Sequence, residues 1–506
     1  MKAVNPTGAP ETAAPDVDIE RKWMLRLAEV MTSQAAETAY SPIVLAGFVR
    51  LFDLAVVAAT GVAVDLLYLP RGTGETLEYG VSIATVSFAT LVVFQALGIS
   101  RVASFRSPIG QGLRLIGGVS MIFLAALAFV FFAKLDGVFS RVWLFGWYAA
   151  ALAGLLVERG LISMVTRRLT QFGRLDRRVA VVGGGPDCER LLKELSAQRD
   201  SDLRIYGVFD DRIGERADDV VAGYPKLGTV DDLVVFARHA RLDLVIFAMP
   251  ITAENRLLQM LRKLWVLPVD IRLAAHSNKL RLRPRSYSYI GTVPVLDVFD
   301  KPIADWDVVL KSAFDRIVSW VLLIVLSPVL LATALAVKID SKGPVFFRQK
   351  RYGFNNELIE VFKFRSMYAE AADATASKLV TKDDPRVTRV GRFIRKTSLD
   401  ELPQLVNVAW FGNLSLVGPR PHAVHAKAAD SAYDEVVDGY FARHKVRPGI
   451  TGWAQVNGWR GETDTREKLQ NRVEHDLYYI ENWSLAFDIY ILAMTPFALM
   501  KTENAY

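Results

Sequence analysis

Cysteine is almost absent from this chain, since Cys188 is the only one among 506 residues. A single thiol excludes an intramolecular disulfide and a cysteine-based metal cluster, which fits a catalytic region in the cytoplasm. The first residues, up to about position 40, also lack the basic segment, apolar core and small-residue cleavage site of a signal peptide. We therefore expect residues 1–42 to form a cytoplasmic tail.

The excess of positive charge is modest, with a formal net charge of +7. Such an excess suits anionic lipid or phosphate as a partner, and the cytoplasmic loops of many integral membrane proteins carry a similar one. We expect no nucleic-acid partner. Hydrophobic residues, in contrast, make up 51% of the chain, which is typical of a protein with membrane spans.

Four apolar stretches, each close to the roughly 20 residues that cross a bilayer, predict a four-helix transmembrane bundle over residues 43–168. They are Leu51–Leu69, Tyr79–Leu97, Leu113–Ala133 and Val142–Met164. Basic residues cluster before the first stretch, between the second and third, and after the fourth, so the positive-inside rule places both ends of the bundle in the cytoplasm. Asp65 and Glu158 are either functional acids within the membrane or acids near its interface.

Between residues 175 and 290, short apolar runs alternate with helical patterns, which predicts βαβ units in a Rossmann-like α/β domain. Glycines at positions 183–185 follow an expected strand and precede an expected helix, the kind of turn that holds a phosphate. The dinucleotide fingerprint fails where Cys188 replaces its third glycine, although Asp210 and Asp211 lie about where a ribose-binding acid would occur. We favour a degenerate module over a working dinucleotide site and assign it no catalytic residue.

A fifth apolar stretch, Ile317–Val337, has Ser327 and Pro328 at its centre. Pro328 cannot donate a backbone hydrogen bond, and the Ser327 hydroxyl can bond back to its own helix, so we expect a sharp bend. Cations flank both ends of the stretch, which favours a cytoplasmic position for both. We therefore predict a re-entrant membrane helix over residues 314–339, after a linker at residues 291–312. A kinked spanning helix is the alternative.

Two adjacent carboxylates, Asp400 and Glu401, lie close in sequence to a group of cations that includes Arg395. A carboxylate that attacks phosphorus needs cations to neutralise the phosphate it approaches. Pro403 predicts that a helix begins near Asp400 and directs the positive end of its dipole at the acids. The alternative is a capping box made by Ser398 and Glu401, in which the acids merely start a helix.

Motifs on both sides of the acidic pair supply further cations. Residues 361–367 alternate apolar and basic residues with the period of a strand, so Lys363 and Arg365 are expected on one face, where they could grip a diphosphate. Arg420 stands between two prolines, which restrict its backbone. Taken singly, these motifs are also compatible with a solvated basic strand and a rigid turn.

Together, the motifs of residues 313–506 resemble the catalytic domain of the bacterial polyprenyl-phosphate hexose-1-phosphate transferases, the monotopic phosphoglycosyl transferases. The matching strings, in order, are Gly343-Pro344-Val345-Phe346-Phe347-Arg348-Gln349, Lys363-Phe364-Arg365-Ser366-Met367, Asp384-Pro385-Arg386-Val387-Thr388, Leu399-Asp400-Glu401-Leu402-Pro403-Gln404, Val417-Gly418-Pro419-Arg420-Pro421 and Arg447-Pro448-Gly449-Ile450-Thr451-Gly452-Trp453-Ala454-Gln455-Val456-Asn457-Gly458. The whole chain is similar to the large members of the family, which begin exopolysaccharide repeat units. That resemblance implies a re-entrant-helix α/β catalytic domain, a middle domain of the CoA-binding type with a structural or regulatory role, and a homodimer in the lipid bilayer of the bacterial inner membrane.

The resemblance also implies a reaction: hexose 1-phosphate passes from a UDP-sugar to undecaprenyl phosphate, and UMP is released. Asp400 is then the nucleophile that forms a covalent phosphosugar intermediate, and Glu401 binds the metal, or orients or deprotonates the acceptor. His422, which follows the Pro-Arg-Pro turn, resembles members that use UDP-glucose.

Several further residues are candidates for binding the substrates. The expected phosphate clamps are Lys363, Arg365, Arg395 and Arg420. Mg²⁺ would offset the charge of the diphosphate, with Asp400, Glu401 and Asp476 as candidate ligands. Three rival functions are a non-catalytic scaffold for polysaccharide assembly, a nucleotide-dependent enzyme that uses the middle domain, and a phosphotransferase with a soluble substrate, which would have no need of the bend at Ser327 and Pro328. The cation-ringed acids argue against the first, and the broken glycine pattern argues against the second.

Overall fold

The computed structural model describes most of the chain from residue 40 to residue 500. The described residues are 40–68, 76–100, 108–135, 138–198, 202–212, 219–249, 253–275, 288–291, 293–369, 384–421, 427–428, 431–432, 440–459, 461 and 465–500. These residues fall into two compact units, one that ends at Arg177 and one that continues from Arg178. Residues 1–39, which hold most of the expected cytoplasmic tail, and His422 lie outside the described residues.

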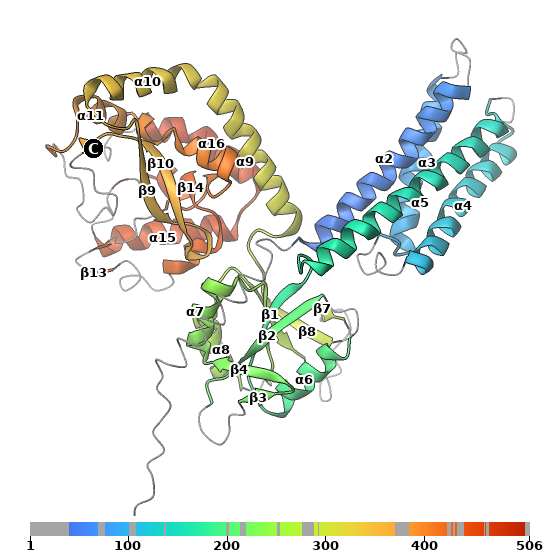
Figure 1. Cartoon of the computed structure of the whole chain (residues 1–506), viewed down its shortest axis with the longest axis horizontal. Coiled ribbons are helices and arrows are strands. Elements are labelled where there is room, and N and C mark those ends of the chain that lie inside the picture. Colours follow the sequence, from blue (N-terminus) through green and yellow to red (C-terminus); the bar gives the residue numbers. More distant parts are fainter. Residues whose placement is uncertain are drawn as a thin grey trace, which may run out of the picture. The chain divides into compact units, whose positions relative to one another are not determined.

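Within the unit Ser33–Arg177, four long helices form a bundle (Figure 1). The helices are α2 (Pro42–Tyr68), α3 (Thr76–Ala96), α4 (Pro108–Phe132) and α5 (Arg141–Gln171). Helix α2 packs against α3 and α5, and α4 packs against the same two helices. Each is long and apolar enough to cross a membrane, which confirms the prediction of four such helices.

Charged residues lie inside this bundle. Asp53 of α2 and Arg159 of α5 are both buried, and their side chains form an ion pair at 2.5 Å. The neighbouring Glu158, which like Asp65 is only partly buried, lies 3.7 Å from Arg159. Of the two acids predicted from the sequence, Glu158 thus joins a buried cluster whose other two members, Asp53 and Arg159, the apolar pattern did not reveal.

The second unit begins with a sheet of eight strands in the order β3-β4-β2-β1-β5-β6-β8-β7. The strands are β1 (Arg177–Val182), β2 (Leu203–Phe209), β3 (Val220–Val221), β4 (Tyr224–Gly228), β5 (Leu244–Phe247), β6 (Asp270–Ala274), β7 (Ser288–Ile290) and β8 (Val293–Phe299). The pairs β1–β5, β5–β6 and β2–β4 are parallel, as the βαβ pattern predicts, and β8 pairs antiparallel with β6 and β7. Helices α6 (Pro186–Ser196), α7 (Val230–Ala240) and α8 (Glu254–Leu264) accompany the sheet. Strand β8 falls within residues 291–312, which the sequence had indicated as a linker.

The rest of this unit starts with two apolar helices, α9 (Asp305–Val325) and α10 (Ser327–Asp340). They meet at an angle of 64°, and together they are long and apolar enough for a broken membrane span or a re-entrant loop. The hydroxyl of Ser327 donates to the carbonyl of Ile324 at 2.7 Å, while Pro328 stands at the start of α10. The predicted bend is therefore confirmed, with the local cause that the sequence indicated.

Short elements and two longer helices complete the unit. They are β9 (Phe346–Tyr352), η5 (Phe354–Asn356), β10 (Leu358–Phe364), α11 (Arg389–Lys396), η7 (Leu399–Glu401), α12 (Gln404–Val406), η8 (Asn407–Phe411), β11 (Ser415–Val417), β12 (Lys427–Ala428), β13 (Ser431–Ala432), η9 (Tyr440–Lys445), β14 (Gly449–Thr451), α14 (Trp453–Val456), α15 (Arg466–Glu481) and α16 (Leu485–Met500). Strands β9 and β10 form an antiparallel hairpin, and β11 pairs in parallel with β14. One apolar core joins β10, α12, β11, α15 and α16.

A buried polar network ties α9 to this core. The ammonium of Lys311 lies 2.7 Å from Asp488 of α16 and also donates to the carbonyl of Val417 in β11. Asp315, one turn along α9, accepts hydrogen bonds from the hydroxyl of Ser415 and the backbone N–H of Leu416, both in β11. The hydroxyl of Tyr479 in α15 donates to Asp488. Because β11 leads directly to the loop with Arg420, this network fixes the start of a loop that reaches the acidic pair.

Candidate active site

Asp400 and Glu401 share one short turn, η7, between α11 and the helical segment that begins at Gln404. Ser398, just before the turn, has a φ of +57°, in the left-handed region that a residue with a side chain seldom adopts. Its side chain does not cap the turn, so the capping-box alternative is wrong. A helical segment does begin here, as Pro403 predicted, but its first turn is a 3₁₀ turn.

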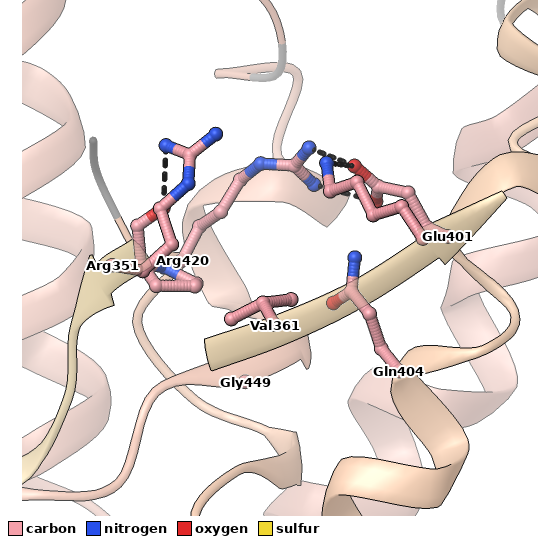
Figure 2. A pocket seen from close by; sticks show the side chains of 8 residues that line it. Arg351, Val361, Glu401, Gln404, Arg420 and Gly449 are labelled. Carbon is pink, nitrogen blue, oxygen red and sulfur yellow. Dashed lines mark hydrogen bonds and ion pairs between the residues drawn. The ribbon is translucent and has the colours of Figure 1, made fainter. Parts of the chain in front are cut away.

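The carboxylate of Glu401 binds two cations that are distant in sequence (Figure 2). The ammonium of Lys363, 38 residues away on β10, donates to Oε1 of Glu401 at 2.9 Å. The guanidinium of Arg420, 19 residues away, donates to both carboxylate oxygens, with one of these bonds at 3.0 Å. Such a bidentate pair fixes both the position and the plane of the guanidinium. Glu401 thus brings together two of the four predicted phosphate clamps.

A pocket opens beside this ion-pair cluster. It is lined by Arg351, Val361, Lys363, Glu401, Gln404, Arg420, Pro421 and Gly449. Figure 2 shows Arg420 and Glu401 pointing toward each other above Val361 and Gln404, with Arg351 on the other side of Arg420. Asp400 shares the turn η7 with Glu401 but is not among the residues that line the pocket. The charges of Lys363, Arg395 and Arg420 all act on Asp400.

The two adjacent acids differ in their electrostatics. Burial, followed by the charge of Glu401, raises the pKa of Asp400 to about 6, against the opposing effect of the surrounding cations. Burial also acts to raise the pKa of Glu401, but Arg420 and Lys363 outweigh it and hold that pKa well below its usual value. Both acids are therefore ionised at neutral pH, and Asp400 is the more basic of the two.

Arg365 does not join the other predicted clamps. Strand β10 ends at Phe364, so the alternation that put Lys363 and Arg365 on one face stops before Arg365. The buried Arg365 guanidinium donates instead to the carbonyls of Lys342 and Ser341, at 2.6 and 2.7 Å, just after the end of α10. In this position it satisfies carbonyls of the loop that follows α10.

The structure gives Asp476 a different partner from the one expected. Its carboxylate is buried on α15 and pairs with the guanidinium of Arg443 at 2.5 Å. Arg443 in turn donates to the carbonyl of Arg420 at 2.8 Å, so Asp476 supports the backbone of the pocket through Arg443. No group of three His, Cys, Asp or Glu side chains placed to bind a metal occurs in the described part of the chain. Asp476 is accordingly not brought together with Asp400 and Glu401.

Three residues at the site escaped the sequence analysis. Arg351 and Gln404 line the pocket, and the buried Asn407 binds β10, the strand that carries Val361 and Lys363. The amide of Asn407 accepts from the backbone N–H of Phe362 at 2.9 Å and donates to the carbonyl of Glu360 at 2.7 Å, along the edge of β10. The two-residue period of β9 could have identified Arg351, but no local pattern marks an asparagine that completes a strand edge.

The two acids predicted at the middle-domain turn bind other groups of the same domain. Asp210 pairs with Arg212 at 2.7 Å, and a Cβ built on Gly184 would overlap both side chains. Asp211 accepts a hydrogen bond from the backbone N–H of Val230 at 2.8 Å, at the start of α7. Both acids therefore have structural partners, in keeping with a degenerate module.

Comparison with known proteins covers nearly the whole chain. A family model described as bacterial sugar transferase matches residues 306–502, and one described as a CoA-binding domain matches residues 95–275. The chain is 39% identical over 428 residues to a UDP-glucose:undecaprenyl-phosphate glucose-1-phosphate transferase of Klebsiella pneumoniae, which covers 83% of this chain and 89% of the relative. Proteins of the same name from Escherichia coli (strain K12) and Xanthomonas campestris pv. campestris are 38% and 32% identical, and cover 83% and 94% of this chain and 89% and 99% of their own length.

These matches include the acidic turn and both cation-bearing motifs within a single family model. They agree with the ordered motifs and with the four apolar helices that precede them. The chain therefore belongs to the bacterial polyprenyl-phosphate hexose-1-phosphate transferases.

Proposed function

We propose that this protein transfers glucose 1-phosphate from UDP-glucose to undecaprenyl phosphate and releases UMP, as the first membrane step of exopolysaccharide synthesis. The observation that carries the proposal is the pair Asp400 and Glu401, held among Lys363, Arg395 and Arg420 beside a pocket. Such an arrangement can attract a diphosphate and present a carboxylate to one of its phosphorus atoms. The names of the full-length relatives supply the sugar and the acceptor.

Asp400 is the nucleophile in this scheme. Its oxygen forms a bond to the sugar-bearing phosphorus, while the bond from that phosphorus to UMP breaks and UMP keeps the electron pair. Undecaprenyl phosphate then attacks the same phosphorus and releases Asp400. Glu401 is poorly suited to the attack because Arg420 and Lys363 hold its pKa well below the usual range. Its role is to position those two cations and to orient the acceptor.

The chemistry of the donor set is compatible with Mg²⁺. This ion is commonly held by one or two carboxylates together with substrate phosphates, and Asp400 and Glu401 offer adjacent carboxylates of that kind. The charge of Glu401 contributes to the raised pKa of Asp400, a repulsion that a divalent cation would relieve. When bound, Mg²⁺ would offset the charge of the donor diphosphate. Asp476 has no part in this site because it pairs with Arg443.

The membrane arrangement follows from charge and shape. The bent pair α9–α10 is proposed to be re-entrant, since cations flank both of its ends and a full crossing would separate the acids from cytoplasmic UDP-sugars. The four helices of the first unit would then span the bacterial inner membrane, with a Rossmann-like middle domain and the catalytic domain on the cytoplasmic face. A homodimer is part of the same proposal, on the basis of the family resemblance.

The test is release of UMP from UDP-glucose by the detergent-solubilised chain, with and without undecaprenyl phosphate and Mg²⁺. Wild-type protein should release UMP in an acceptor-dependent manner, Asp400→Asn should lose this activity, and the control Asp187→Asn, in the middle domain, should keep it. Release of UDP would mean that the sugar alone is transferred, which contradicts attack on phosphorus. If no UDP-sugar gave a product, the scaffold function would be favoured instead.

A further inference from the structure

The second unit holds the middle domain together with the catalytic domain, and side chains of the two are in direct contact. Arg241, at the end of α7 in the middle domain, pairs with Glu357 of the catalytic domain at 2.7 Å. Close by in sequence, the buried Asn355 of η5 donates from its amide to the carbonyl of Ala237 in the last turn of α7, at 3.1 Å. The φ of Asn355 is +52°, in the left-handed region that asparagine tolerates better than most residues. An asparagine thus suits both the backbone of η5 and the contact with α7.

Two cation–aromatic contacts join the same two domains. The guanidinium of Arg238 in α7 lies 4.4 Å from the ring centre of Phe441 in η9. The ammonium of Lys445, at the end of η9, lies 5.2 Å from the ring centre of Trp265, which directly follows α8. A cation within about 6 Å of the centre of an aromatic ring is attracted to its face. The middle domain therefore contacts both η5 and η9 of the catalytic domain.

Both of these elements lead to the pocket. The turn η5 joins β9 to β10, in the hairpin that carries Arg351 of the pocket lining. The segment η9 carries the buried Arg443, whose guanidinium donates to the carbonyl of Arg420 at 2.8 Å. A hydrogen bond between the side chains of Asn356 and His444 links η5 to η9. A displacement of η9 would therefore move a group that holds the backbone of Arg420.

We propose that the middle domain positions the active site: by holding η5 and η9, it keeps Arg443 against the backbone of Arg420, and so keeps Arg420 beside the acidic pair. This inference rests on the proposed function, in which Arg420 binds the donor diphosphate. Arg241 and Trp265 are then positioning residues that act through Arg443. Release of η9 leaves the guanidinium of Arg420 less well placed for a phosphate, because bidentate recognition depends on its position and plane. Binding of the UDP-sugar should therefore weaken.

Reversal of the ion pair between Arg241 and Glu357 tests the proposal in the full chain in detergent. Arg241→Glu and Glu357→Arg each place two like charges at this contact, whereas the double variant restores an opposite pair. We expect each single variant to raise the KM for UDP-glucose roughly two- to fivefold, the range of a partly exposed ion pair, and the double variant to return it toward the wild-type value. A smaller amount of folded protein would lower the rate but leave KM unchanged, so KM separates positioning from stability.

Arg256→Glu is the matched control, since it reverses the same charge at an exposed residue in the first turn of α8. This variant should keep the wild-type KM. Amide hydrogen exchange supplies a second readout that does not require activity. The amides of η9 should exchange faster in Arg241→Glu than in wild type or Arg256→Glu, and the double variant of Arg241 and Glu357 should restore the slower exchange.

Two results would overturn the assignment. Equal exchange of η9 in Arg241→Glu and Arg256→Glu would mean that the middle domain does not hold this segment. Faster exchange with an unchanged KM would mean that η9 moves without displacing Arg420. If Arg241→Glu fails to fold, Glu357→Arg decides by the same comparisons. Failure of the proposed function is distinct, since wild-type protein would then release no UMP while the exchange of η9 would still respond to Arg241→Glu.

Discussion

Lys311 is the cation of the buried network that joins α9 to the strand before Arg420, and its removal should be severe. Its ammonium lies 2.7 Å from Asp488 and 3.6 Å from Asp315, and the three residues are at most 6% exposed. The substitution Lys311→Met keeps much of the side-chain volume but leaves both carboxylates without this cation. Loss of one partner of a buried ion pair costs about 3–5 kcal/mol.

The loss should be visible in thermal unfolding of the detergent-solubilised protein, followed by tryptophan fluorescence. The melting temperature of a domain of about 150–250 residues falls by about 2–4 °C for each kcal/mol of lost stability. We therefore expect the melting temperature of Lys311→Met to fall on the order of 10 °C. Lys338→Met is the matched control, because Lys338 is exposed and donates to the Gly343 carbonyl at 3.3 Å. A surface change of this kind should shift stability by about 0.5 kcal/mol or less.

A second variant separates the charge from the packing. Asp488→Asn removes one of the two carboxylates, so its combination with Lys311→Met should be less unstable than the sum of the single losses. Additive losses, or a melting temperature of Lys311→Met equal to that of Lys338→Met, would refute the view that charge pairing holds this network.

Three further changes probe the site itself. The proposed nucleophile is ionised Asp400, and its pKa is raised to about 6. We therefore expect kcat/KM for UMP release to rise between pH 5 and 7 and then level off, and a rate that fell over this interval would contradict the assignment. Asn407→Ala removes two hydrogen bonds from the edge of β10, including that to Phe362, and should cost about 2–4 kcal/mol in thermal unfolding and lower turnover. The exposed Asn457→Ala, which loses one bond to a helix carbonyl, should have little effect on either measurement. Ser398→Val places a β-branched residue at positive φ and should cost about 1–2 kcal/mol, whereas Ser398→Gly should be tolerated, so equal stabilities of the two variants would argue against strain at this turn.

Features with local causes could be predicted from the sequence. The four apolar helices follow from their length and composition, and the bend between α9 and α10 follows from one proline and one neighbouring hydroxyl. The same holds for the parallel strand pairs of the middle domain, which the alternation of strand and helix patterns indicates. In each case the residues that decide the outcome are a few positions apart in the chain.

Features that depend on partners distant in the chain could not be predicted. Lys363 and Arg365 look equivalent in an alternating pattern, but β10 ends between them, and Arg365 is taken up by carbonyls after α10. The ion pair of Asp53 and Arg159 joins two helices that are far apart in sequence, and each residue alone resembles an isolated charge in an apolar stretch. Pairing of this kind appears only once the chain is packed.

The proposed division of roles between Asp400 and Glu401 has the same origin. Sequence spacing makes the two acids equal neighbours on one turn, and nothing local makes either the better nucleophile. The difference comes from Lys363 and Arg420, which both form ion pairs with the carboxylate of Glu401 and lower its pKa. The oxygens of Glu401 are therefore occupied by these two cations. The charge of Glu401 then helps to raise the pKa of Asp400, and a more basic carboxylate is the stronger nucleophile toward phosphorus. In the proposed mechanism, the choice of Asp400 as the attacking residue therefore rests on two side chains, 38 and 19 residues from Glu401, that never need to contact Asp400.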